Sequence, residues 1–233
     1  VEVVEEEAFD GCEALTYVEC GKLEIIGNYA FESCKSLGSI KLPSAKTVEG
    51  WAFCDCHALT NVKFGKELES IGYAAFYECT SLERIAIPLK DGMITENNTF
   101  QRCKSLKQVN LVEGAVLRDT IDALLLDEWR NNMKDEIGVI NQILPNTPAG
   151  SCYNFEVGGK AQAVRMWIRS VLHNIIRYKY QHRSLLNEYA TAVQHAFPKD
   201  IVLNNSFLSS NCHHSHLKGR IMRGEEEGDV NDS

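Results

Sequence analysis

The 233-residue sequence lacks several features that would assign it to a class at once. No apolar run approaches the roughly 20 residues that cross a bilayer, so no transmembrane segment is predicted. Basic residues are outnumbered, with 24 Lys and Arg against 32 Asp and Glu. The net charge of −8 argues against a nucleic-acid partner, whose protein ligands usually carry a basic field. Composition is otherwise that of a globular chain of one or two domains.

Motifs for catalysis are missing as well. The sequence has no nucleophile elbow, no His-Glu-x-x-His and no phosphate-binding loop. Gly158-Gly159-Lys160 lacks the upstream Gly and the following Ser or Thr that such a loop needs. We therefore predict no enzyme, no catalytic residue and no cofactor. The chain begins with Val and has no leader-like segment, so we expect further sequence upstream.

One phrase recurs through the first half of the chain, namely Ala-Phe-x-x-Cys-x-x-Leu. Four copies are complete and a fifth has Thr99 in the Ala position. The Phe residues follow one another at steps of 22, 22, 23 and 24. After each Leu come two alternating, mostly apolar positions, which is typical of a strand, and another apolar position precedes the Ala. Such units bury their apolar residues only by stacking, so residues 1–111 are predicted to form a solenoid of about five repeats.

The repeat as a whole resembles a known family. The run Ile-Gly-x-x-Ala-Phe-x-x-Cys-x-x-Leu-x-x-Ile-x-Leu-Pro is similar to the short, cysteine-bearing leucine-rich repeat of BspA-like surface proteins, over about residues 4–111. The resemblance implies a protein-interaction or adhesion solenoid without catalytic residues. It implies only a core role for residues such as Phe31, Cys34 and Leu37.

Strand alternation predicts which side chains face outward from the solenoid. If the Val18-type and Cys20-type positions point inward, the positions beside them form two outward columns. The candidate protein-binding face consists of Tyr17, Ser39, Asn61, Arg84 and Gln108 in one column and Glu19, Lys41, Lys63 and Asn110, with Ala86, in the other. An ordinary hydrated sheet face is the alternative, because neither column gathers aromatic and arginine side chains.

Nine cysteines are the unusual feature of the composition. Five occupy one repeat position, Cys12, Cys34, Cys56, Cys79 and Cys103. We predict free, buried thiols there, with disulfides between neighbouring coils as the alternative. Free thiols favour a reducing compartment such as the cytoplasm, although the localisation stays open.

Two cysteine-containing segments raise the question of a metal. Cys54-Asp55-Cys56-His57 superficially resembles a ligand cluster. Since Cys56 occupies a predicted core position of the repeat and no second ligand pair lies at zinc-site spacing, we predict no metal there. The segment Cys212, His213, His214 and His216 is a more plausible ligand set, with a disordered polar tail as the alternative.

The second half changes to helix-forming residues. Residues 115–143 and 161–197 are predicted to be two long helices, joined by a proline-containing loop over 144–151. The second carries a coiled-coil-like stripe, at Val164, Ile168, Val171, Ile175, Tyr178, His182, Leu185, Tyr189, Ala192 and Ala196. Its string from Trp167 to Leu186 resembles the extension that follows such repeats in microalgal proteins, and this resemblance implies no activity.

The two helices differ in charge. Residues 111–136 carry seven acidic and three basic side chains, whereas residues 160–199 carry seven basic side chains and Glu188. This favours an antiparallel helical hairpin over residues 112–200 with complementary flanks. The alternative is that the basic helix contacts an acidic partner or a membrane surface. Residues 201–233 are predicted to be a disordered tail, so the fold class is α+β.

The leading functional hypothesis is a non-enzymatic protein-protein interaction scaffold that uses the outward strand face. One alternative is a cell-surface or adhesion module of the BspA-like type. The other is a self-assembling module, in which the helical hairpin makes a homodimer. The identity of the protein partner stays open.

Overall fold

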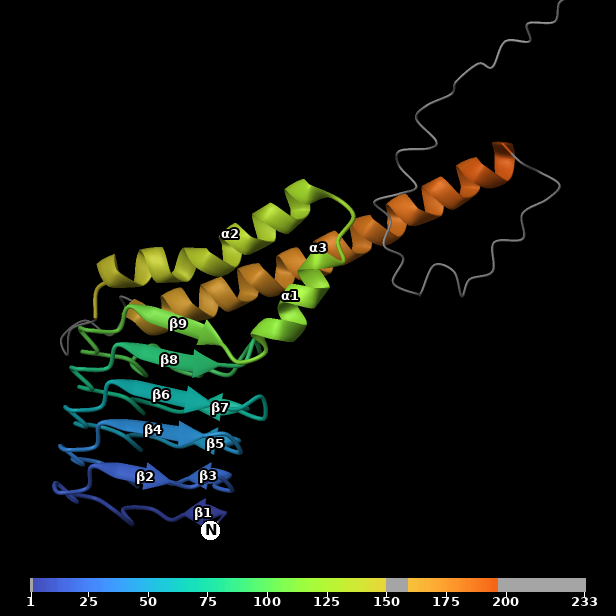
Figure 1. The fold of residues 1–233 in the computed structure, drawn as a ribbon. Coiled ribbons are helices and arrows are strands. Elements are labelled where there is room, and N and C mark those ends of the chain that lie inside the picture. Colours follow the sequence, from blue (N-terminus) through green and yellow to red (C-terminus); the bar gives the residue numbers. More distant parts are fainter. Residues whose placement is uncertain (1, 150–158, 197–233) are drawn as a thin grey trace, which may run out of the picture. The chain divides into compact units, whose positions relative to one another are not determined.

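The structure is a computed structural model that describes residues 2–149 and 159–196 (Figure 1). Within these described ranges, nine strands precede three α-helices and one short 3-10 helix. The strands are β1 Val3–Val4, β2 Tyr17–Glu19, β3 Ile25–Ile26, β4 Ser39–Leu42, β5 Thr47–Val48, β6 Asn61–Phe64, β7 Ser70–Ile71, β8 Arg84–Ile87 and β9 Gln108–Leu111. The helices are α1 Gly114–Asp122, α2 Asp127–Ile143, the 3-10 helix η1 Leu144–Asn146 and α3 Gly159–Ala196.

The predicted solenoid is confirmed, and it has two parallel sheets (Figure 1). Strands β2, β4, β6, β8 and β9 form the five-stranded sheet, and β1, β3, β5 and β7 form the four-stranded one. The second sheet arises from the apolar position before the Ala, where Val4, Ile26, Val48 and Ile71 are buried. Each coil, numbered 1 to 5 by its repeat Phe, therefore pairs with the next coil on two sides.

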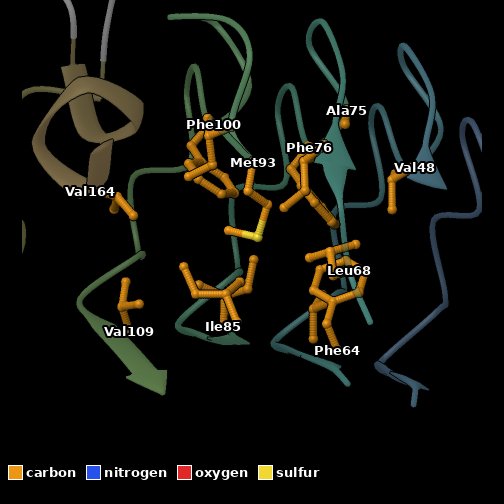
Figure 2. Packing of buried hydrophobic residues seen from close by; sticks show 14 of the residues in the cluster. Val48, Phe64, Leu68, Ala75, Phe76, Ile85, Met93, Phe100, Val109 and Val164 are labelled. Carbon is orange, nitrogen blue, oxygen red and sulfur yellow. The ribbon is translucent and has the colours of Figure 1, made fainter. Parts of the chain in front are cut away.

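The repeat phenylalanines form a stacked file through the interior. Successive ring centroids from Phe9 to Phe100 lie 5.1, 5.3, 5.3 and 5.7 Å apart. Figure 2 shows Phe76 and Phe100 in this file, above Phe64 and Ile85 of the five-stranded sheet. Because identical side chains recur at each coil, every coil offers its neighbour the same apolar surface.

The turns between the sheets adopt a left-handed backbone at two repeat positions in coils 1 to 4 and at one of them in coil 5. One lies just before the Ala position, at Glu7, Tyr29, Trp51 and Ala74. The other lies just before the Cys, at Gly11, Ser33, Asp55, Glu78 and Arg102. Most of these residues are not glycine, so the stacking of coils holds a backbone conformation that an isolated repeat would disfavour.

The helical half has one helix more than predicted. The single helix predicted over residues 115–143 is wrong, because the chain turns between Asp122 and Asp127 and forms two helices, α1 and α2. The predicted apolar face continues through the turn, with Ile121 buried before it and Met133 and Ile140 after it. Leu124, within the turn, is also buried, so packing of the turn against the core interrupts the helix.

Helices α2 and α3 run antiparallel, as the hairpin predicts. The ring centroids of Trp129 and Tyr178 lie 5.4 Å apart, and Trp167 Nε1 donates a 2.9 Å hydrogen bond to the Glu136 carbonyl. Helix α3 buries Val164, which lies beside the coil-5 core in Figure 2. The helices thus share one apolar core with the end of the solenoid.

The chain has two compact units, Val1–Tyr180 and Gln181–Ser233. The α3 stripe is buried at four of its five positions in the first unit, Val164, Ile168, Val171 and Tyr178. In the second unit Leu185 and Tyr189 are exposed. Within the described ranges, no helix combines the length and apolar character needed to traverse a membrane. The predicted tail, including Cys212, His213, His214 and His216, lies outside the described residues.

Polar groups of the helical half complete the hydrogen bonding of coil 5. The backbone N–H of Arg102 donates to the carbonyl of Ala149. In the preceding repeat, the equivalent N–H of Glu78 donates to a backbone carbonyl of coil 5. The N–H of Val109 in β9 donates to Asn141 Oδ1 at 2.8 Å. The buried Lys160 ammonium donates to the carbonyl of Leu106. The helices therefore cap the sheet edge that a sixth coil would otherwise cover.

Candidate binding surface

The structure brings the predicted outward residues together on the five-stranded sheet. Its parallel register places Tyr17, Ser39, Asn61, Arg84 and Gln108 in one row of paired positions. Lys41 pairs with Glu19 on one side and with Lys63 on the other, and the row continues through Ala86 to Asn110. The side chains between these rows, such as Ile40, Val62 and Ile85, are buried. The predicted inward and outward assignment is thus confirmed, whereas the binding role stays a prediction.

The middle of this face is basic. Lys41, Lys63 and Arg84 are exposed on three successive strands. Lys41 and Lys63 are direct register partners, about 4.8 Å apart between strands. Within the described part of the chain, none of the three side chains forms an ion pair. Apart from Glu19 beside Lys41, the middle of the face therefore presents positive charge without ion pairs, on a chain whose net charge is −8.

Sequence analysis missed an aromatic cluster on the turns beside the four-stranded sheet. The rings of Tyr29 and Trp51 stack with centroids 5.2 Å apart, and Trp51 and Tyr73 are tilted at 4.5 Å. Tyr73 is 40% exposed. Aligning the residues just before the Ala position would have found Tyr29 and Trp51, but Tyr73 lies one residue earlier in its repeat, so the column is visible only in space.

The cysteine position does more than fill space. Each thiol donates to the carbonyl of the repeat Phe in the preceding coil, from Cys34 to Phe9 at 3.2 Å up to Cys103 to Phe76 at 3.0 Å. Cys56 and Cys79 repeat this bond. Burial raises the pKa of Cys34 to about 11 and that of Cys103 to about 12, which keeps these thiols protonated as donors.

The core prediction is confirmed for four of the five repeat cysteines, Cys34, Cys56, Cys79 and Cys103, which are fully buried. Cys12 is exposed instead, because coil 1 has a neighbouring coil on one side only in the described chain. All seven cysteines of the described residues are free.

The segment from Cys54 to His57 lies on the ridge where coils 2, 3 and 4 meet. The ligand atoms of Glu32, Cys54 and Asp55 lie within 4.8 Å of one another, and so do those of Asp55, His57 and Glu78. We call these five residues the ridge cluster. Desolvation, with help from Asp10, raises the pKa of Glu32. Desolvation, together with Asp55 and Glu32, raises the pKa of the Cys54 thiol.

The basic charge of α3 contacts the solenoid rather than α2. Arg169 Nε donates to Asp91 Oδ1 at 2.9 Å, and Arg165 donates to Asn97 Oδ1. Among the described residues there is no ion pair between α2 and α3. The predicted complementary flanks of the hairpin are therefore wrong as direct pairs. The acceptors of these arginines, one carboxylate and one side-chain amide, lie between β8 and the repeat Phe of coil 5.

The repeat region of the chain is similar to a known protein family. The family model described as "BspA type Leucine rich repeat region" matches residues 2–118 in six copies, which is half of the chain. No curated protein matches the sequence. The helices beyond residue 118 lie outside the matched range.

Two solved structures are similar to the chain. The leucine-rich repeat protein of T. pallidum is 24% identical, with a TM-score of 0.36, over 47% of this chain and 63% of that one. A leucine-rich repeat protein from Bacteroides ovatus is 25% identical, with a TM-score of 0.32, over 47% of this chain and 43% of that one. The chain thus spans less than two thirds of either relative. With coils, register and family match in agreement, the chain belongs to the BspA-type leucine-rich repeat family.

Proposed function

We propose that this chain is a non-enzymatic binding module whose five-stranded sheet face takes an acidic protein segment. The family match indicates a protein-interaction or adhesion-like repeat module, and leucine-rich repeat families are typically non-enzymatic. The observation that carries the proposal is the basic patch of Lys41, Lys63 and Arg84 on adjacent strands, whose side chains form no ion pair among the described residues.

The patch costs the fold stability, which argues for a use outside the fold. Like charges on paired strand positions repel one another, and Lys41 and Lys63 are such a pair. Glu19 is the other register partner of Lys41 but forms no ion pair with it among the described residues, whereas Lys35 pairs with Glu13 at 2.6 Å and Lys46 with Glu24 at 2.7 Å. A carboxylate-rich segment laid across the strands would neutralise the patch and fix its register.

The proposal is tested with a labelled peptide of ten glutamates, whose binding to the purified chain is followed by fluorescence anisotropy. Lys63→Glu with Arg84→Glu is expected to weaken binding about tenfold at low salt, because each reversal replaces an attraction by a repulsion. The matched control, Lys66→Glu with Lys90→Glu, makes the same charge change on exposed lysines away from the face. Equal affinity of both variants for the peptide would remove this face from consideration.

Self-association through α3 is a second candidate function, favoured by one observation. Met166 and Tyr180 are 62% and 76% exposed, and with Ile176 they leave an apolar strip opposite the buried stripe. Met166, His173 and Tyr180 follow one another at seven-residue steps, the spacing at which two like helices pack. We therefore propose a homodimer in which the α3 strips of two copies pack together. An adhesion role rests on the family match alone.

A further inference from the structure

We infer that the ridge cluster is a binding site for one divalent transition-metal ion of the Zn²⁺ type. Its first three ligands would be the Glu32 carboxylate from coil 2 and the Cys54 thiolate and Asp55 carboxylate from coil 3, which lie within 4.8 Å of one another. The His57 imidazole, which groups with Asp55 and Glu78, would complete the set from the other side of Asp55. The inference is independent of the proposed binding face, because the ridge lies on the turns and not on the five-stranded sheet.

The repeat period brings these donors together. Glu32 and Cys54 occupy the same position of successive repeats, directly after the Phe, and Asp55 and Glu78 occupy the next one. Coil stacking therefore places side chains that are 22 or 23 residues apart within ligand distance, in two triads that share Asp55. Sequence analysis sought a second ligand pair along the chain at zinc-site spacing and so missed ligands that come from neighbouring coils.

A buried carboxylate oxygen without a hydrogen-bond partner supports a cation site in the ridge cluster. Asp55 Oδ1 is shielded from solvent and has no hydrogen-bond partner, the one such side-chain atom within the described residues. Leaving such an atom unpaired is costly, and more so for a charged group. Glu32, Asp55 and Glu78 concentrate acidic groups around this atom. A divalent ion would satisfy the oxygen and offset the charge.

The neighbours of the cluster favour some of its members as ligands. His57 Nδ1 lies 3.1 Å from the Glu78 carbonyl oxygen, and donation from Nδ1 leaves the Nε2 lone pair for a metal. Metal-bound histidines commonly have such a carbonyl partner. Arg102 pairs with the Glu78 carboxylate, which makes Glu32 the better second carboxylate ligand and Glu78 an outer support.

The donor set selects the class of metal. One sulfur, one imidazole nitrogen and two carboxylates suit tetrahedral Zn²⁺, whereas Mg²⁺ and Ca²⁺ take oxygen ligands. In the metal-free protein the Cys54 thiol donates a hydrogen bond to the Glu32 carboxylate. Binding replaces that S–H by an S–metal bond and releases the proton to solvent, with no change of oxidation state.

The test uses the full chain carrying Cys212→Ser, His213→Ala, His214→Ala and His216→Ala, so that the tail segment cannot supply a second ligand set. Zn²⁺ binding is measured by calorimetry, and Co²⁺ is used as a spectroscopic probe. We expect one Zn²⁺ per chain and a sulfur-to-cobalt charge-transfer band. Cys54→Ser should abolish the band, and both Cys54→Ser and His57→Ala should weaken Zn²⁺ binding by at least about tenfold.

Matched controls are Cys12→Ser and His173→Ala, which remove an exposed thiol and an exposed imidazole away from the ridge. Both should bind Zn²⁺ like the parent. Thermal melting without metal checks that each variant folds. If the Cys54→Ser variant does not fold, the double variant Asp55→Asn with Glu32→Gln tests the same site. No Zn²⁺ binding by the parent, or undiminished binding by the ridge variants, would overturn the inference.

Discussion

The residue type that a position of this fold tolerates depends on the atoms that the neighbouring coil places next to it. Gly21, Pro43, Gly65 and Pro88 occupy one repeat position, directly after the strand of the five-stranded sheet in coils 2 to 4 and two residues after it in coil 1. A Cβ on Gly65 would lie 1.8 Å from the Pro43 carbonyl oxygen, whereas a Cβ on Gly21 would meet nothing within 4 Å. The same residue type in the same repeat position is thus required in coil 3 and optional in coil 1.

This contrast yields a matched prediction. Gly65→Ala is expected to lower the free energy of unfolding by about 1–3 kcal/mol, because coils 2 and 3 must separate locally to admit the methyl group. Gly21→Ala should change it by less than about 0.5 kcal/mol. Urea denaturation of both variants measures the difference. Equal effects would show that the close approach of Gly65 to Pro43 is relieved without cost.

Much at the residue scale is predictable from the sequence. Phe31, Cys34 and Leu37 are core residues because their spacing repeats, and the columns of the sheet face follow from alternation alone. The contact of Trp51 with Tyr73 and the ridge cluster are not, because both join residues of different coils. Tyr73 is also shifted by one residue within its repeat. Such contacts depend on coil register, which no single repeat encodes.

Among the elements, the N-terminus of α3 is the one that closes the solenoid. Lys160 is 2% exposed, and its ammonium donates to the carbonyls of Leu106 and, at 3.4 Å, Lys104. These carbonyls belong to coil 5, which is the last coil among the described residues. A buried lysine is retained here because it supplies several donors at the end of a long side chain.

Lys160→Met keeps the apolar stem and removes the donors. We expect a loss of about 1–3 kcal/mol in the free energy of unfolding, because the coil-5 carbonyls stay buried without a partner. Burial lowers the pKa of Lys160 in the folded state, so the unfolded chain binds more protons just below pH 10.5. Wild-type stability therefore gains from rising pH in that window. The Met variant, followed by urea denaturation, should lack this gain, and a variant as stable as the wild type would contradict the capping role.

The helices show where sequence periodicity reaches its limit. The spacing from Leu117 to Leu144 predicts one continuous apolar face, and that face exists. It does not reveal the turn between Asp122 and Asp127, since a buried Leu124 fits a continuous helix equally well by spacing. The antiparallel pairing of α2 and α3 follows from the sequence, whereas their role as the solenoid cap needs the positions of Asn141, Ala149 and Lys160.

At the scale of the whole molecule, the proposed homodimer predicts a mass. Light scattering coupled to size exclusion should give twice the chain mass of 26.2 kDa at high concentration, with dissociation on dilution. Ile176→Glu with Tyr180→Glu should give a monomer, because two charges enter the apolar strip. Asn131→Asp with Gln142→Glu places the same charge on exposed positions of α2 and should stay dimeric. A wild-type mass that is monomeric at every concentration would contradict the dimer.

The architecture of the first half is predictable from the sequence, because a solenoid repeats one local solution and each copy confirms the others. The positions of the helices are less so. Their contacts with coil 5, such as Arg165 with Asn97 and Arg169 with Asp91, join segments 68 and 78 residues apart that share no repeat. Only the three-dimensional packing shows that these arginines serve the solenoid and not the hairpin.

The two-sided pairing of the coils has a mechanical consequence. The backbone hydrogen bonds between coils, such as Phe31 to Ala52, run along the stack and not across it. A force applied along the stack would break the hydrogen bonds of one coil boundary at a time, instead of breaking the bonds of many boundaries together. Each opened coil of 22 residues would release up to about 75 Å of extended chain. The solenoid would then lengthen one coil at a time, in steps of similar length, because the repeats differ by at most two residues.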